Sequence, residues 1–260
     1  MAVAGDLATV ERIERAALAT WPAIVEKRDG TWVLRRAEGH SGRANSVTFL
    51  DPDDDVDWCP RLEALEAFYR DADLTPLIRE TPLAPRSLVR ELAARGWRQA
   101  ENRGETIVMS TRLSEPPAVR TEVERLDAVS PEWLVATGAL MAYSHARRDA
   151  LGRKLAGLAA PAAFFLCRDG SGAVVATALG VIDGDMLAIY DVAVAVGHRR
   201  QGHAHMMVAA AFEWGWRAGA HTAFLQVVAT NEPAVALYRR LGFAERYRYR
   251  YLAPPAESAG

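Results

Sequence analysis

The chain has 260 residues, half of them apolar and a quarter charged, with a formal net charge of -2. This length suits two compact units of about 110–140 residues each. The near-neutral charge gives no general attraction to nucleic acid or to anionic lipid, so we expect neither as a partner. The chain has no run of the roughly 18 apolar residues that a membrane span needs. With only two cysteines and no signal-peptide order at the N-terminus, we expect a cytoplasmic protein.

The first half shows helical periodicity and short runs typical of strands, separated by turn residues. In chain order it predicts a helix over 7–20, strands near 31–36 and 45–50, helices over 60–71 and 86–95, and a strand over 105–112. The paired prolines of segment 114–118 stop either neighbouring element from continuing. We therefore predict a first domain over 1–113, a linker, and a second domain over 119–260.

The second half alternates strands with helices, which predicts an α/β sandwich built on a mixed sheet. Its expected elements are a strand over 119–126, helices over 130–142 and 147–158, strands over 162–168, 173–182 and 186–195, a helix over 203–218, a strand over 221–229, a helix over 232–241 and a strand over 244–252. Segments 88–113 and 234–254 both run helix, glycine, aromatic residue, strand. Because each segment lies near the end of its half, this repeated order of elements favours an internal duplication.

A candidate anion site follows the most strand-like run of the chain, in the sequence DVAVAVGHRRQGHAH. The strand runs into Gly197, the basic pair Arg199 and Arg200 follows, and Gly202 and Ala204 then open a helix. The first amides of a helix lack intrahelical partners, and the helix dipole turns its positive end toward them. Gly202 has no Cβ to keep a phosphate from the backbone. The glycine patterns of the Rossmann and Walker motifs are both absent.

A second candidate site begins at Asn231, which is a favourable helix N-cap and is followed by Pro233 in the first turn. Tyr238 lies seven residues on, about two turns further along nearly the same face. The two side chains are thus able to line one cleft. The alternative is that Tyr238 only packs, because its helix is also amphipathic.

Two segments together resemble the GNAT acyltransferase superfamily. DVAVAVGHRRQGHAHMM is similar to the superfamily's strand–loop–helix motif, with its Arg/Gln-x-x-Gly-x-Gly/Ala signature, and HTAFLQVVATNEPAVALYRRLGF is similar to the strand, Asn-containing turn and helix that follow it. The resemblance covers about 119–252. It implies an N-acetyltransferase that uses acetyl-CoA as co-substrate, built from tandem GNAT-like units. Each unit is expected to have a mixed, mostly antiparallel central sheet flanked by helices.

The resemblance also implies site residues. The loop backbone is expected to bind the CoA pyrophosphate, and the preceding strand to bind pantetheine, so strands 186–195 and 221–229 should splay apart. Asn231 is expected to contact the cofactor, and Tyr238 to protonate the departing thiolate. The implied cofactor-binding residues are Val192, Ala193, Val194, Arg199, Arg200, Gln201, Gly202, His203, Ala204, His205 and Asn231.

The sequence departs from the superfamily at the general base. Some protein N-terminal acetyltransferases carry a Glu five residues before the Asn, where this chain has Gln226, which cannot act as a base. Asp191 is the nearest carboxylate in sequence and is either a base, directly or through water, or a structural acceptor. Strand alternation predicts Tyr190 on the opposite face from Asp191. No metal is expected, since His203 and His205 face different directions on a helix.

The first half resembles, more loosely, the N-terminal lobe of bacterial two-lobed GNAT proteins. Aspartates follow its strand 45–50 where a phosphate loop would bring arginines, which predicts a degenerate unit and one CoA site per chain. Arg43 and Asn45 either reach the acceptor or only pack.

The leading hypothesis is acetyl transfer to a primary amine of a small molecule or peptide, by direct attack in a ternary complex. The chain is expected to be a monomer or homodimer. The alternatives are a non-catalytic CoA-binding or regulatory module, and a purely structural tandem domain.

Overall fold

A computed structural model describes residues 6–37, 41–54, 58–101, 103–115 and 122–255. The helices are α1 (Leu7–Thr20), α2 (Trp58–Arg70), α3 (Arg86–Ala94), α4 (Pro131–Leu140), α5 (His145–Ala156), α6 (His203–Arg217) and α7 (Glu232–Arg240), with 3-10 turns η1 (Gly42–Ala44) and η2 (Val196–His198). The strands are β1 (Val25–Asp29), β2 (Trp32–Arg36), β3 (Val47–Phe49), β4 (Ile78–Glu80), β5 (Arg98–Gln99), β6 (Thr106–Arg112), β7 (Val123–Leu126), β8 (Ala162–Arg168), β9 (Val174–Asp183), β10 (Met186–Val194), β11 (Thr222–Val228) and β12 (Ala244–Ala253).

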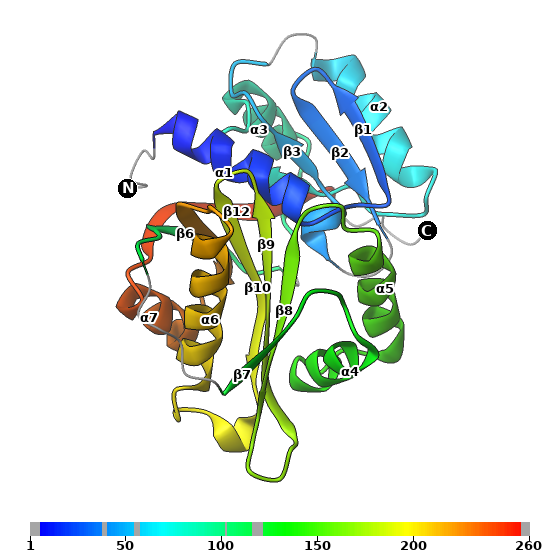
Figure 1. Ribbon diagram of the computed structural model, residues 1–260. Helices are drawn as coiled ribbons and strands as arrows, with labels where there is room; N and C mark the ends of the chain where they lie inside the picture. Colours follow the sequence, from blue (N-terminus) through cyan, green and yellow to red (C-terminus); the bar gives the residue numbers. More distant parts are fainter. Residues whose placement is uncertain (1–5, 38–40, 55–57, 102, 116–121, 256–260) are drawn as a thin grey trace.

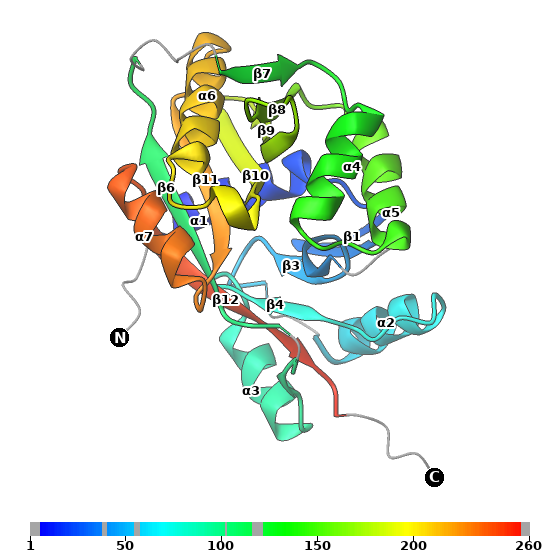
Figure 2. The same cartoon turned by 90° about the horizontal axis from the view of Figure 1, so that it is seen from below.

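In the described part of the chain, the strands form one sheet that runs through both halves. Its order is β1-β2-β3-β4-β12-β6-β11-β10-β9-β8-β7, with β5 paired to β12. Figure 1 labels most of these strands, and Figure 2 labels β4 and β11. Within that order β3–β4 and β10–β11 are parallel, and the other pairs are antiparallel. The expectation of a mixed, mostly antiparallel sheet flanked by helices is therefore confirmed.

The two halves exchange strands at the middle of the sheet. β6 closes the first half in sequence, yet it pairs with β11 on one side and with β12 on the other. β12 pairs with β6 over 244–249 and then with β4 over 250–252. The division into 1–113 and 119–260 stays a prediction about the chain, and residues 116–118 of the expected linker lie outside the described residues.

The helices lie on both faces of the sheet in the second half (Figures 1 and 2). Ile13 of α1, Trp133 of α4 and Leu151 of α5 share one buried core with Tyr190 of β10. Residues of α6 and α7 form a separate core with the other face of β10 and β11. Side chains from the first half of the sequence therefore meet one face of β10, and the α6–α7 layer meets the opposite face.

Most predicted elements are present within a few residues of their expected bounds. Asp6 caps α1, because its Oδ1 accepts from the amide of Ala8 at 3.2 Å. Three short strands were not predicted. β1 reads VEKRD, which is too polar for a strand signal, and β4 and β5 have three and two residues. In the expected strand 119–126, β7 begins at Val123, and residues 119–121 lie outside the described part.

A buried ion pair joins the halves beneath α1. The Glu14 carboxylate is 0% exposed and accepts two hydrogen bonds from Arg79 of β4, at 2.6 and 3.1 Å. The Tyr247 hydroxyl of β12 donates to the same carboxylate. The Arg79 guanidinium also lies 4.2 Å from the centroid of the Tyr249 ring. Helix α1 is thus anchored to strands of both halves.

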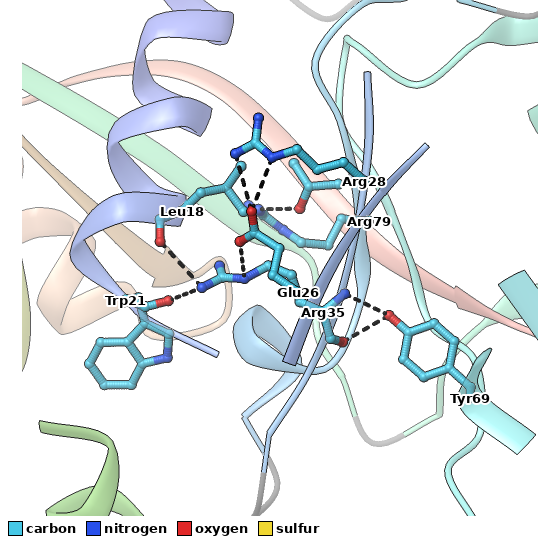
Figure 3. Close-up of polar contacts among 8 residues, drawn as sticks. Leu18, Trp21, Glu26, Arg28, Arg35, Tyr69 and Arg79 are labelled. Carbon is cyan, nitrogen blue, oxygen red and sulfur yellow. Dashed lines mark hydrogen bonds and ion pairs between the residues drawn. The ribbon is translucent and has the colours of Figure 1, made fainter. Parts of the chain in front are cut away.

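The other end of α1 is held by a second buried arginine (Figure 3). Arg35 of β2 donates to the carbonyl oxygens of Leu18, at 3.2 Å, and of Trp21. Burial lowers the pKa of Arg35 to about 10, and Glu26, whose carboxylate lies 3.6 Å from the Arg35 Nε, opposes that shift. The residue that ends α1, Trp21, is therefore fixed in place. Among the described residues, no helix has the length and apolar character of a bilayer span.

Candidate active site

Strands β10 and β11 separate partway along their length. Their parallel pairing runs from Met186 opposite Thr222 to Ile189 opposite Leu225, and the described chain shows no pair beyond. β10 continues to Val194 and stays paired on its other side with β9, through Ala193 and Thr177. The predicted splay is confirmed, and it leaves one edge of β10 without a strand partner.

A β-bulge lies directly after the last paired residue. The register of β10 against β9 shifts between Tyr190 and Ala193, and Asp191 has a φ of 49°. Because a bulge interrupts alternation, Tyr190 and Asp191 do not face opposite sides of the sheet. The surroundings of the two residues agree: the Arg43 guanidinium lies 5.0 Å from the Tyr190 ring centroid, and its positive charge is the strongest of those that lower the pKa of Asp191. The prediction that Tyr190 lies on the other face was wrong.

The Asp191 carboxylate is enclosed and incompletely satisfied. Its Oδ1 accepts from the Tyr143 hydroxyl at 3.4 Å, and its Oδ2 is buried without a hydrogen-bond partner among the described residues. Burial raises the pKa of Asp191, and the positive charges of Arg43, Lys154 and Arg147 oppose that shift. A buried carboxylate with a free oxygen and a raised pKa is suited to accept a proton.

The loop before α6 has the form of an anion site. Gly202 is the N-cap of α6 with a φ of 90°, and Arg200 before it also has a positive φ of 63°. A Cβ added to Gly202 would meet no atom within 4 Å. The amide of Met206 bonds to the Gly202 carbonyl at 3.0 Å, so the amides between them precede the first closed turn. The side chains of Arg199, Arg200 and Gln201 are exposed.

The three histidines of this loop have different surroundings. The His198 Nε2 lies 3.6 Å from an oxygen of Asp169, and the His203 Nδ1 lies 3.6 Å from the sulfur of Cys167. His205 is exposed on the first turn of α6. They therefore do not converge on one point.

The predicted acid, Tyr238, lies on the α6–α7 side of the separated strands. We call the space between β10 and β11 beyond Ile189 and Leu225 the gap. Asn231 caps α7 by accepting from the amide of Ala234 at 3.3 Å. Tyr238 is 9% exposed and shares a core with Ile189 and Leu225, the last paired residues before the splay. Its hydroxyl has no hydrogen-bond partner among the described residues. Burial alone raises the pKa of Tyr238 to about 12, so the phenol keeps its proton at neutral pH.

Gln226, which stands where some related enzymes have a Glu base, takes part in a hydrogen bond beside the separated strands. It follows Leu225, so it is the first residue of β11 beyond the splay. Its Oε1 accepts from the Tyr249 hydroxyl at 2.8 Å, while its Nε2 is buried without a partner in the described chain. A free amide donor therefore lies beside the gap.

A cluster of side chains that the sequence did not bring together surrounds the bulge. We call Trp21, Arg43, Lys154, Tyr190 and Asp191 the Trp21 cluster. The Trp21 and Tyr190 rings lie 4.7 Å apart, and the Lys154 Nζ and the Arg43 guanidinium lie 3.6 and 4.5 Å from the Trp21 ring. Burial, with Arg43 next in weight, lowers the pKa of Lys154 to about 7. Its members come from α1, η1, α5 and β10, so no local motif signals it.

A hollow of about 360 Å³ lies elsewhere, between α1 and the β9–β10 turn. Its lining includes Arg12 and Asp185, which form an exposed ion pair, and no residue of the bulge or of the α6 loop. The strand separation, rather than this hollow, therefore locates the candidate site.

Known proteins resemble this chain over nearly its whole length. The family described as "Probable histone acetyltransferase Rv0428c C-terminal" matches residues 7–252. The "Uncharacterized N-acetyltransferase YobR" of Bacillus subtilis (strain 168) is 28% identical over 250 residues, which cover 93% of this chain and 97% of that protein.

Solved structures share the fold. A GCN5-related N-acetyltransferase from Kribbella flavida matches with a TM-score of 0.67 and 21% identity, over 99% of this chain and 97% of that one. A tandem GNAT protein from the clavulanic acid biosynthesis pathway matches with a TM-score of 0.64 and 15% identity, over 82% of this chain and 74% of that one. With the family match over 7–252, the splayed strands and the glycine-capped loop, the chain belongs to the GNAT superfamily of N-acetyltransferases.

Proposed function

We propose that the protein transfers an acetyl group from acetyl-CoA to a primary amine by direct attack in a ternary complex. The observation that carries this proposal is the separation of β10 from β11 after Ile189 and Leu225. Tyr238 packs in the core on one face at that level, and Asp191 lies among the residues of the other face. A thioester in the gap would thus have a proton donor and a proton acceptor on opposite sides.

The proposed cofactor contacts follow the superfamily. The diphosphate binds at the start of α6, to the amides of Gly202 through His205, with Arg199, Arg200 and Gln201 around it. Pantetheine pairs with the free edge of β10 at Val192, Ala193 and Val194, and Asn231 contacts the cofactor from α7. The exposed cationic side chains and the open space at Gly202 support this arrangement.

The proposed chemistry needs three proton transfers. The acceptor ammonium loses one proton to Asp191, and the free amine attacks the thioester carbonyl to form a tetrahedral intermediate. The carbon–sulfur bond then breaks, and the thiolate takes the proton of the Tyr238 hydroxyl. The attacking nitrogen loses its second proton through water to the Tyr238 phenolate, which leaves the neutral amide and restores the phenol. Because the pKa of Tyr238 is raised to about 12, the phenol remains an available donor across the neutral range.

Tyr238→Phe is expected to lower kcat by about 100-fold, the usual contribution of a positioned acid. The variant keeps the ring that packs 5.8 Å from Phe243, and it breaks no hydrogen bond of the described structure. Stability and acetyl-CoA affinity are therefore expected to stay unchanged, as measured by thermal unfolding and calorimetry. Full turnover by this variant at every pH would exclude the acid role.

Asp191→Asn is expected to remove the fall of kcat at acidic pH from the pH profile. A base must be deprotonated, so activity falls as pH drops through its pKa, and burial has raised that pKa above the usual aspartate value. The measurement is kcat at saturating substrates from about pH 5 to pH 9 for both enzymes. The same fall in both enzymes would assign it to the amine substrate and leave Asp191 a structural role.

The overall proposal is tested by thiol release from acetyl-CoA across a panel of amines. Release that depends on an amine supports acetyl transfer. Binding of CoA without turnover of any amine would instead support a non-catalytic CoA-binding module, a function that Gln226 at the place of a Glu base favours. The absence of any thermal shift with CoA would leave the chain a structural tandem domain.

A further inference from the structure

We propose that the acceptor is an amino carboxylic acid, whose carboxylate is bound by Arg43 with Lys154 and whose amine faces Asp191. This inference rests on the proposed function and names the substrate class of the same site. Tyr190 and Asp191 follow Ile189, the last β10 residue paired with β11, so the Trp21 cluster adjoins the point where the strands part. It lies on the face of α1 and α5, opposite Tyr238, and thus on the side left for the acceptor.

The cluster has an excess of positive charge. Its members include two cations, Arg43 and Lys154, and one carboxylate, Asp191, and the exposed Arg147 adds a third positive charge that acts on Asp191. None of these three cations makes an ion pair in the described part of the chain. By contrast, Arg79 pairs with Glu14 at 2.6 Å, and Arg61 with Asp54 at 2.7 Å. Arg43 and Lys154 are half-buried, where an excess of positive charge is costly, and a bound carboxylate would reduce that cost.

Aromatic rings hold the cations in place. The Arg43 guanidinium lies over the Trp21 ring at 4.5 Å and the Tyr190 ring at 5.0 Å, and the Lys154 Nζ lies over Trp21 at 3.6 Å. A guanidinium packed on a ring face keeps its N–H edge for a planar carboxylate. Tyr190 is fixed by a 2.8 Å hydrogen bond between its hydroxyl and Thr20. Figure 3 shows the Trp21 backbone held by Arg35. The recognition surface is therefore preorganised.

The single carboxylate of the cluster matches the other end of such an acceptor. The Asp191 Oδ2 is buried without a hydrogen-bond partner, so it is available to an ammonium group. A zwitterion would satisfy both Asp191 and Arg43 at once. A lysine-rich peptide would instead add positive charge beside Arg43, Lys154 and Arg147, and is disfavoured. The lowered pKa of Lys154, about 7, agrees with a site that still lacks its anion.

The test compares amino acids with their own carboxamides, which differ only in the carboxylate. The wild type is expected to show at least about tenfold higher kcat/KM for the acids, and Arg43→Gln to lower kcat/KM for the acids by about 10- to 100-fold. In the same variant kcat/KM for the carboxamides should fall less than kcat/KM for the acids, so that the preference for the acids is reduced, and the affinity for acetyl-CoA should stay within about twofold of wild type. Arg43→Lys, which keeps the charge, should retain part of the preference. Arg217→Gln, which removes an exposed arginine of α6, is the control and should change nothing.

The outcomes separate this inference from the proposed function. Equal use of acids and carboxamides, preference for a basic peptide or for an amine bearing a phosphate, or an unchanged preference in Arg43→Gln would overturn the inference while acetyl transfer stands. If no amine is turned over, acetyl transfer fails, and calorimetry with CoA present decides the inference. Binding of the acid but not its carboxamide, lost in Arg43→Gln, would then support it, and no binding of the acid would overturn it.

Discussion

Gly202→Asp is expected to weaken acetyl-CoA binding by about 1000-fold while the protein still folds. Aspartate adopts a positive φ more often than most residues, so its strain at a φ of 90° is smaller than that of other side chains, and an added Cβ would meet no protein atom within 4 Å. Its carboxylate would instead lie at the helix N-terminus where the diphosphate binds. Two like charges about 5 Å apart repel by about 3 kcal/mol at the dielectric of a protein surface, and a diphosphate carries more than one.

The measurement is calorimetric titration of acetyl-CoA, with Gly219→Asp as the matched control. Gly219 follows the other end of the same helix, has a φ of 91°, and also has open space around it. The two variants should lose similar stability in denaturant, and only Gly202→Asp should lose acetyl-CoA affinity. Equal affinity in both variants would place the cofactor phosphates somewhere other than the start of α6.

Glu14→Gln is expected to lower the free energy of unfolding by about 3–5 kcal/mol. The substitution leaves the Arg79 guanidinium, which is 2% exposed, without its charge partner. It also removes the charged acceptor of the Tyr247 hydroxyl. Glu14, Arg79 and Tyr247 come from α1, β4 and β12. The lost free energy is therefore that of the contact between α1 and the sheet that both halves share.

Urea unfolding of three variants checks this expectation. Glu213→Gln is the control, because Glu213 forms an exposed ion pair with Arg217, and its loss should cost less than about 1 kcal/mol. Replacing both buried partners, as Glu14→Leu with Arg79→Met, should recover much of the stability, because no buried charge is left alone. A Glu14→Gln protein as stable as the wild type would mean that water reaches Arg79.

The sequence predicted the elements of the second half well, because their signals are local. Helical periodicity and turn glycines determined α6, α7 and the strands around them, and the predicted helix over 7–20 matches α1. β1, β4 and β5 were missed because they are charged or very short, and pairing with neighbours stabilises them. The sequence also did not predict that β6 pairs with β11 and β12, or that β12 pairs with β4. Strand partners far apart in sequence leave no periodic signal.

For the candidate site, the sequence by itself determined the loop at Gly202, the cap at Asn231 and the spacing to Tyr238. Each of these depends on backbone conformation within a few consecutive residues, so composition and order suffice to predict it. Only the tertiary structure decided that a bulge turns Asp191 toward the same cluster as Tyr190, and that Trp21, Arg43 and Lys154 meet them there. Those contacts join four elements drawn from both halves of the chain. Their energies come from burial and charge at close range, which no local pattern records.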